Sequence, residues 1–233
     1  MSTQNSSAQP LQRAQAAVRA IRRAVPRGSG AAALALTVAA AGFFLCEVNP
    51  AAVLHTWYLT RAAGLVAYVL VYLSVAVGLL QSLGMLRGLT APASNLAVHE
   101  HLSLWALYAT VFHAVILLWD KYIPFRAPAL LLPFASDYEP VEVTLGVLAA
   151  YTMVVAIVST YLRTRLKPLH WRVLHLLSLA GFLFALVHGV ALGTDSGHPA
   201  VGFLYRFTGL SVGLLASWRL IKGVWSRHAD TPG

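Results

Sequence analysis

Histidine side chains supply most of the chemistry available to this 233-residue chain, which contains nine of them. Four stand as two widely spaced pairs inside apolar stretches: His99 with His113, and His175 with His188. Ionisable side chains in membrane-length apolar segments are costly to bury and are functional candidates by default. A single histidine on an apolar helix is more often a packing residue, but two paired sets are harder to explain that way. The pattern therefore predicts a metal or haem site, or a proton relay.

The spacing within each pair sets two depths along a helix. His99 and His113 are 14 residues apart, which places them within about 40° of one helical face and about 21 Å apart along the axis. His175 and His188 are 13 residues apart, so their axial separation of about 19–20 Å matches. Two facing imidazoles at equal depth are the axial ligands of a six-coordinate b-type haem. Two such levels predict two stacked haems.

The second pair has a phase problem, because 13 residues put His175 and His188 about 140° apart on an ideal helix. Helix tilt, a 3₁₀ stretch or a bulge is needed to correct it. His170 is in better phase with His188, but about 27 Å would separate them, too far to match the first pair. His101 is about 120° out of phase with His113. Whether His170 or His101 replaces a predicted ligand is left open, although we expect both to be surface groups or hydrogen-bond partners of ligands.

Composition identifies the elements that must position these histidines. The chain is 58% hydrophobic and 11% charged, against about 45–50% and about 25% in soluble domains, which excludes a soluble globular enzyme. A membrane-spanning helix needs about 20 mostly apolar residues. The sequence therefore predicts an all-α integral membrane protein with six transmembrane helices and a polar turn at Ala93–Asn95. The predicted spans are about 31–48, 57–80, 97–119, 141–162, 169–193 and 200–221.

Charge predicts the orientation of the bundle. With six spans, both termini lie on the same side of the membrane, and 13 of the 17 Lys and Arg residues are in the tails or links on that side. Lys and Arg concentrate on the cytoplasmic side of membrane proteins. Both termini are therefore predicted to be cytoplasmic. The membrane is predicted to be the bacterial inner (plasma) membrane. In that orientation His99 and His175 lie near the cytoplasm, and His113 and His188 lie nearer the outside. The net charge of +9 needs no nucleic acid partner.

Several motifs are specific enough to carry a family resemblance. They are Arg61–Ala62–Ala63–Gly64, His99-x13-His113, Trp171–Arg172–Val173–Leu174–His175-x12-His188 and Gly193–Thr194–Asp195. Over residues 57–221 the chain resembles the ferric-reductase-like transmembrane domain of ferric reductases and NADPH oxidases. It is also similar to the haem-binding membrane subunit of the periplasmic methionine sulfoxide reductase system. The resemblance implies that His99 and His175 hold an inner haem and that His113 and His188 hold an outer one.

The chain departs from that family in two respects. It has no Gly-rich nucleotide-binding fingerprint, and only about a dozen residues follow the last span, so FAD or FMN is expected only through a partner chain. Leu117 stands where the oxidases carry a further histidine, which argues against superoxide production. The only cysteine, Cys46, excludes an intrachain disulfide and a c-type haem attachment motif.

These features together predict a di-haem b-type membrane cytochrome, an oxidoreductase subunit for electron transport whose catalytic residues are unknown. Its electron donor would be a cytoplasmic flavoprotein or quinol. Its outer-side acceptor would be a ferric chelate, dioxygen or a periplasmic redox protein. Arg61 and Arg206 near the outer haem and Arg172 near the inner one are expected to pair with haem propionates, or alternatively to reach lipid headgroups.

Two other functions compete with this one. The first is a histidine-based metal-ion or proton transporter without haem; such proteins usually carry carboxylates at mid-membrane, and spans three and five have no central Asp or Glu. The second is a membrane anchor subunit in which haem serves assembly.

The remaining segments have less specific predictions. Residues 1–30 form a basic cytoplasmic tail that is an amphipathic membrane-surface helix, a disordered tail or a targeting segment. Residues 31–56 contain the first span and an outer loop, and residues 222–233 form a cytoplasmic tail. The apolar loop at about 120–140 is expected to lie in the membrane surface, either as a lid or without a functional role.

Overall fold

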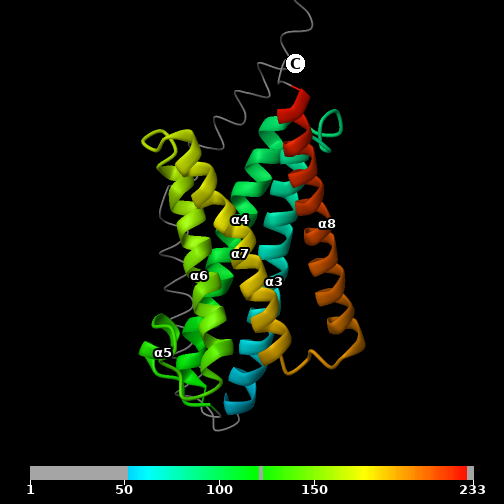
Figure 1. Cartoon of the computed structure of the whole chain (residues 1–233). Coiled ribbons are helices and arrows are strands. Elements are labelled where there is room, and N and C mark those ends of the chain that lie inside the picture. Colours follow the sequence, from blue (N-terminus) through cyan, green and yellow to red (C-terminus); the bar gives the residue numbers. More distant parts are fainter. Residues whose placement is uncertain (1–51, 121–122, 230–233) are drawn as a thin grey trace, which may run out of the picture. The chain divides into compact units, whose positions relative to one another are not determined.

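Five long helices dominate the computed structural model, which describes residues 52–120 and 123–229. They are α3 (Ala52–Leu83), α4 (Pro92–Ile116), α6 (Pro140–Tyr161), α7 (Pro168–Leu192) and α8 (Pro199–Ala229) (Figure 1). The short helix η1 (Leu117–Trp119) extends α4, and α5 (Ala127–Leu131) lies in the loop that follows. Each long helix contains a segment long and apolar enough to cross a membrane. The chain is therefore an all-α integral membrane protein.

Prolines mark the starts of four of these helices, because the fixed φ of proline suits the first helical turn and its missing N–H has no partner there. Pro92, Pro140, Pro168 and Pro199 all occupy this position. The five helices confirm the predicted spans from 57–80 onward. The predicted polar turn at Ala93–Asn95 is wrong: these residues form the first turn of α4, since Pro92 starts that helix earlier.

The predictions for residues 1–30 and for the first span, 31–48, lie outside the described residues. The number of six spans therefore stays a prediction, and so does the cytoplasmic position of both termini. The division of the chain into four segments also stays a prediction.

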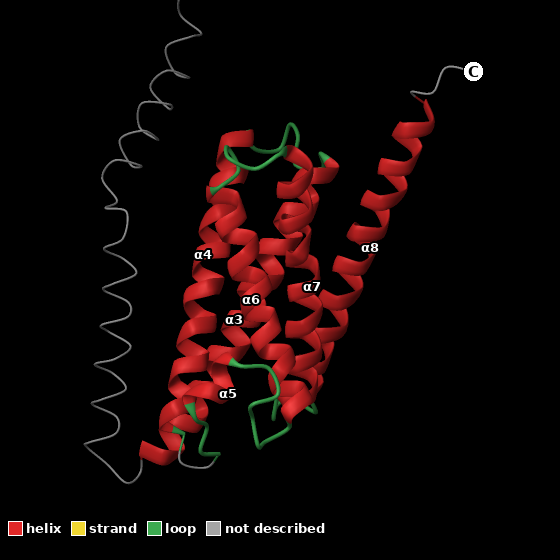
Figure 2. Ribbon diagram, turned by 60° about the vertical axis from the view of Figure 1, so that its left-hand side comes forward, coloured by secondary structure: helices red, strands yellow, loops and turns green. Residues whose placement is uncertain are grey.

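Two antiparallel hairpins build the bundle. α3 packs along α4 and α6 packs along α7, and these two pairs make the most extensive helix contacts in the described part of the chain. Figure 2 shows α3, α4, α6 and α7 side by side, with α8 inclined beside them. α8 packs mainly on α3 and more lightly on α7. Because α8 packs beside the two hairpins, it leaves the space between α3–α4 and α6–α7 for a site.

An aromatic cluster fixes α8 to its neighbours. Phe182 of α7 is fully buried, and Tyr68 of α3 stacks on it with ring centroids 6.0 Å apart. Tyr205 of α8 meets Tyr68 edge-on at 5.0 Å. The hydroxyls of Tyr68 and the fully buried Thr208 hydrogen-bond to each other, which satisfies two polar groups inside an apolar contact.

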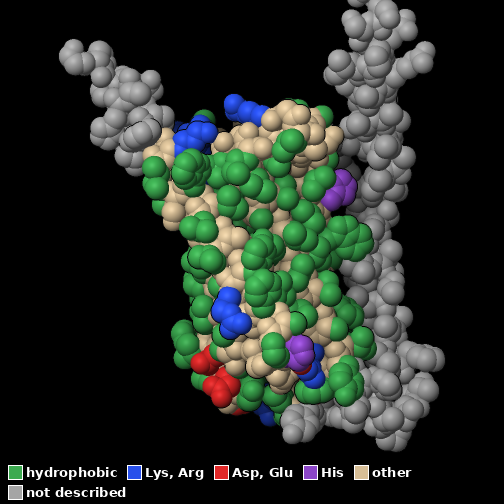
Figure 3. All heavy atoms as spheres, turned by 90° about the vertical axis from the view of Figure 1, so that its right-hand side faces the viewer, with side chains coloured by type: hydrophobic (Ala, Val, Ile, Leu, Met, Phe, Trp, Pro, Cys, Tyr) green, Lys and Arg blue, Asp and Glu red, His purple; other side chains and the backbone are tan. Residues whose placement is uncertain are grey.

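The outer surface of the bundle suits contact with lipid. On the face in Figure 3, hydrophobic side chains cover the middle of the molecule and acidic side chains gather at one end. Leu210, Leu214 and Trp218 of α8 are each more than 60% exposed. Apolar side chains on the outside of a spanning helix are expected where lipid replaces water.

The loop that contains α5 is tied to α6. The Tyr151 hydroxyl donates to the Leu131 carbonyl, and the backbone N–H of Phe134 donates to Thr144 Oγ1 at 2.7 Å. Leu132 and Phe134 remain 57% and 69% exposed. The loop therefore presents apolar side chains outward, as a membrane-surface segment would, and its action as a lid stays a prediction.

Candidate functional site

The four paired histidines line one continuous cavity of about 960 Å³ between the two hairpins. His99 of α4 faces His175 of α7 with ring centroids 6.0 Å apart. His113 of α4 faces His188 of α7 at 6.4 Å. The structure thus brings together the residues that the sequence spacing paired, at two levels of one cavity, and their role as ligands stays a prediction.

Both histidines of α4 are oriented by backbone carbonyls of α3. His113 Nδ1 lies 3.0 Å from the Thr60 carbonyl oxygen, and His99 Nδ1 lies 3.0 Å from the Ser74 carbonyl oxygen. A carbonyl can only accept, so each Nδ1 carries the proton and donates it. The Nε2 atom of each ring is then the unprotonated nitrogen, which is the form that binds a metal.

His188 of α7 follows the same rule on the second hairpin. Its Nδ1 donates to the Glu142 carbonyl oxygen of α6 at 2.8 Å. Since this carbonyl comes from the backbone, the carboxylate of Glu142 is not needed for the interaction. His188 therefore also has an Nε2 atom free for a ligand.

Glycines stand where these three rings meet the neighbouring helix. A Cβ atom at Gly64 would lie 2.9 Å from Cε1 of its histidine, and the corresponding distances are 3.0 Å at Gly78 and 2.8 Å at Gly146. Real Cβ atoms essentially never come closer than 3.0 Å, which excludes a side chain at Gly64 and Gly146 without a shift, and the contact at Gly78 would be tighter than nine in ten real ones. Each glycine also lies four residues after the carbonyl that orients the same ring. The absence of a side chain thus lets each imidazole pack against the helix backbone.

His175 is held differently. Its Nδ1 lies 3.4 Å from Thr160 Oγ1 of α6, and the Thr160 hydroxyl donates to the Ala156 carbonyl at 3.1 Å. Trp171 stacks on the His175 ring with centroids 5.4 Å apart and an interplanar angle of 22°. A hydroxyl and an indole thus contact this ring, and Thr160 stands at the position where the other three rings have a glycine.

The angular offset between His175 and His188 on α7 is not corrected by a 3₁₀ stretch or by a bulge, two of the expected corrections. The helix is an unbroken α-helix from Pro168 to Leu192, so within this described segment there is neither a 3₁₀ stretch nor a bulge. His175 and His188 instead reach separate points on α6, near Thr160 and near Glu142. Those two contacts let both rings meet their partners on α4 despite their angular offset.

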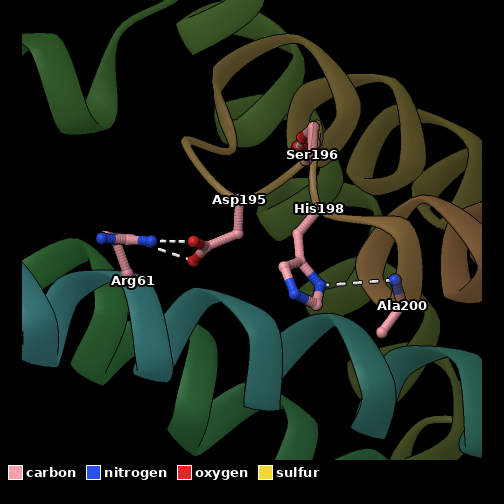
Figure 4. Close-up of polar contacts among 6 residues, drawn as sticks. Arg61, Asp195, Ser196, His198 and Ala200 are labelled. Atoms are coloured by element: carbon pink, nitrogen blue, oxygen red, sulfur yellow. Dashed lines mark hydrogen bonds and ion pairs between the residues drawn. The ribbon is translucent and has the colours of Figure 1, made fainter.

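The alternative histidines lie away from the cavity. His101 is exposed, and its Nδ1 lies 2.6 Å from the Ala97 carbonyl of its own helix. His170 is exposed as well, and neither residue belongs to the cavity wall. His198 Nδ1 accepts the N–H of Ala200 at 3.3 Å, so this histidine caps the start of α8 (Figure 4).

The three arginines expected near propionates lie in different settings. Arg61 lines the cavity and forms a two-contact ion pair with Asp195, with Nε 3.0 Å from Oδ2 and Nη2 against Oδ1 (Figure 4). Its guanidinium also lies 4.0 Å from the centroid of the Trp57 ring. Arg172 is exposed and lines the cavity, whereas Arg206 is exposed and is not part of the wall.

Sequence reasoning missed several residues of the site. Arg163 and Arg219 line the cavity, although the sequence had connected them only with membrane orientation. Gly78, Gly146 and Thr160 were missed as well. A signal for them existed, because Gly64 to Gly78 and Gly146 to Thr160 each span 14 residues, the same spacing as His99 to His113.

Two buried polar atoms in the wall have no hydrogen-bond partner within the described residues. They are Thr60 Oγ1 and Trp171 Nε1. Thr60 provides the carbonyl for His113, and Trp171 stacks on His175, so one such atom lies beside each histidine pair. Buried donors normally have a partner. Both atoms are therefore polar groups of the cavity wall that are available to a ligand.

The geometry of each pair fits haem iron. Metal–imidazole bonds are about 2.0–2.1 Å long and the ring centre lies about 1.1 Å further, so two rings on opposite sides of one metal have centroids about 6 Å apart. The observed 6.0 and 6.4 Å agree with this value. Two facing imidazoles are the axial ligand set of a six-coordinate haem, and haem binding at these pairs stays a prediction. Among the described residues no group of three or more His, Cys, Asp or Glu could hold a bare metal ion.

Fold and site together define the class: an all-α integral membrane protein with two facing histidine pairs inside a helical bundle. The chain belongs to the family described as a domain of unknown function, DUF8596, which matches residues 55–195. The matched region includes all four paired histidines and Asp195. Comparisons with curated proteins and with solved structures found no match. The resemblance to ferric-reductase-like domains stays a prediction.

Proposed function

We propose that this chain is a di-haem b-type membrane cytochrome, similar to the ferric-reductase-like domain, that moves electrons across the membrane. The observation that carries the proposal is the pairing of His99 with His175 and of His113 with His188, at centroid distances that suit one iron atom each. Haem, when bound, supplies a one-electron redox couple inside the bilayer. The residues of the chain bind it, orient it and set its surroundings.

The backbone contacts give each ligand a fixed orientation. Donation from Nδ1 of His113 to the Thr60 carbonyl holds the ring and its tautomer and makes Nε2 more basic, as outer hydrogen bonds to metal-bound histidines do. The same reasoning applies to His99 and His188. Gly64, Gly78 and Gly146 leave room for the rings in these positions. The backbones of α3 and α6 thus set the position of these three rings.

Polar groups at the cavity wall suit the haem propionates. Trp171 Nε1 and Thr60 Oγ1 are buried donors without a hydrogen-bond partner among the described residues, and Arg163, Arg172 and Arg219 line the cavity. Guanidinium–carboxylate pairing is strong because it is charge-assisted. Arg61 is already paired with Asp195, so its part in propionate binding would require that pair to open or to be shared.

The direction of electron movement follows from the predicted orientation. With both termini cytoplasmic, the His99–His175 pair is near the cytoplasm and accepts electrons from a flavoprotein or quinol. The His113–His188 pair then delivers them to a ferric chelate, dioxygen or a periplasmic redox protein. The chain would act as an electron-transfer subunit embedded in membrane lipid.

Haem quantitation and a redox-difference spectrum of the purified full chain test the proposal. We expect two haems per chain and a reducible bis-histidine b-type spectrum. His99→Ala or His113→Ala should each lower the haem content to about one, while His101→Ala, which alters an exposed histidine of the same helix, should leave two. Protein from haem-replete cells that lacks haem would contradict the proposal. Metal-ion uptake into vesicles by that haem-free protein would favour a transporter.

A further inference from the structure

The end of the bundle nearest the His99–His175 pair is strongly basic. Seven exposed Lys and Arg side chains lie there, and Glu100 is the one acidic residue at this end among the described residues. The seven, which we call the basic mouth, are Arg87, Arg163, Arg165, Lys167, Arg172, Arg219 and Lys222. Lys222 Nζ donates to the Leu83 carbonyl at 3.0 Å, which fixes this part of α8 beside the end of α3. On the face in Figure 3, acidic side chains are seen only at the opposite end.

The cavity reaches the surface at the basic mouth. Arg163, Arg172 and Arg219 belong to its wall and are exposed. Tyr161, another residue of the wall, is 64% exposed. The three arginines come from the α6–α7 link, from α7 and from α8, so three separate segments each place a cation at the same opening.

One of these cations is connected to the histidine pair by an aromatic ring. The Arg163 guanidinium lies 5.6 Å from the centroid of the Trp171 ring, which is a cation–π distance. Trp171 in turn stacks on His175. A surface cation and a paired histidine therefore contact the same indole, and this opening is where a donor bound at the surface comes near the His99–His175 pair.

The charge of the basic mouth discriminates between the two electron donors that the proposed function leaves open. Basic residues on the predicted cytoplasmic side also set membrane orientation, but orientation alone does not require them to surround the cavity opening. A quinol is neutral and dissolves in the bilayer, so surface cations contribute nothing to its binding. A protein with an acidic face is attracted by them, and such steering raises association rate constants by about 10- to 1000-fold.

We propose that the basic mouth is the docking surface for an electron-donor protein whose contact face is acidic. The proposal rests on the proposed function, because it assumes a haem at the His99–His175 pair, and it selects the flavoprotein over quinol. In each encounter the reduced flavin of the donor loses one electron and the ferric iron gains it. Arg165 and Lys167, which are exposed and outside the cavity wall, provide charge for docking without contact to the cofactor.

The test measures haem reduction by stopped-flow absorption, with the purified full chain in phosphatidylcholine nanodiscs, where the lipid has no net charge and both ends of the bundle are accessible. Reduced flavodoxin is the acidic protein probe, and decylubiquinol is the neutral comparison. Raising the salt from about 0.01 M to about 1 M shortens the screening length from about 30 Å to about 3 Å. We expect the rate constant with flavodoxin to fall at least about ten-fold over this range, and reduction by decylubiquinol to be slower and independent of salt.

A matched pair of charge reversals locates the docking surface. Arg165→Glu alters the basic mouth, and Arg126→Glu makes the same change at an exposed position in the loop at the opposite end. We expect Arg165→Glu to lower the flavodoxin rate constant about three-fold or more at low salt and to leave it unchanged at high salt, since surface charges act mainly on association. Arg126→Glu should leave it unchanged at both. If Arg165→Glu lowers the haem content, Arg165→Gln, which only removes a charge, is expected to give a smaller decrease of the same kind.

The opposite results are equally specific. Chains with two haems whose flavodoxin rate constants are equal in Arg165→Glu and Arg126→Glu overturn the inference, and they are the result expected if the cations serve only lipid headgroups. Faster reduction by decylubiquinol than by flavodoxin overturns it as well. Absence of haem from the unaltered chain would instead contradict the proposed function.

Discussion

Gly146 of α6 lies directly against the ring of His188 of α7, so closely that a Cβ atom would come within 2.8 Å of Cε1 and 2.9 Å of Nδ1. The same glycine follows by four residues the carbonyl that accepts the hydrogen bond from this ring. The backbone carbonyl of Glu142 therefore orients the ring, and the lack of a side chain at Gly146 leaves room for it.

Gly146→Ala should displace the His188 ring and empty one haem site. The added methyl group cannot fit without moving either the ring or α6, and a histidine ligand must be placed to within about 0.5 Å. We expect haem content to fall from two towards one per chain. Gly213→Ala is the matched control, because nothing lies within 4 Å of that position. Equal haem content in both variants would show that the glycine does not position the ligand.

Trp171→Phe should weaken retention of the haem held by His99 and His175. The substitution keeps an aromatic ring to stack on His175 but removes the buried Nε1 donor. A hydrogen bond to a charged group contributes about 1.5–3 kcal/mol, so haem transfer to apomyoglobin should be roughly ten-fold faster or more. Trp105→Phe, at a 56% exposed position outside the cavity wall, is the control. Identical transfer rates would assign the indole N–H to another role.

The Arg61–Asp195 ion pair should contribute little to stability. Its side chains are 24% and 45% exposed, and pairs with that exposure contribute about 0–1 kcal/mol. A double-mutant cycle of Arg61→Met and Asp195→Asn, measured by unfolding in detergent, should give a coupling of that size. Haem content should stay at two in Asp195→Asn, since neither residue orients a histidine. Loss of a haem in that variant would instead place the pair in cofactor binding.

Cysteine accessibility tests the predicted orientation. In a Cys46→Ser background, a membrane-impermeant maleimide applied to intact cells should label Gly197→Cys in the α7–α8 loop. It should label Leu89→Cys, in the α3–α4 turn, only after the cells are opened. Both positions are accessible, because Leu89 is 78% exposed and Gly197 has open space around it. The reverse pattern would mean that the bundle is inverted and would exchange the inner and outer histidine pairs.

The sequence by itself determined the elements and their axial register. Apolar segments of membrane length predict helices from local composition alone, and the described residues contain five of them, four of which start with proline. The spacing of His99 from His113 and of His175 from His188 predicts two depths, because the rise per residue of a helix is constant.

Only the tertiary structure decided what each ring meets. The hydrogen bonds to Thr60, Ser74 and Glu142 use backbone carbonyls. Because every residue type has a backbone carbonyl, residue types alone cannot predict these contacts. The close approach of Gly146 to His188 and the contact of the Thr160 hydroxyl with His175 depend on how α6 packs against α7. Packing of one helix on another is a long-range property, and the residues it brings together are far apart in the chain.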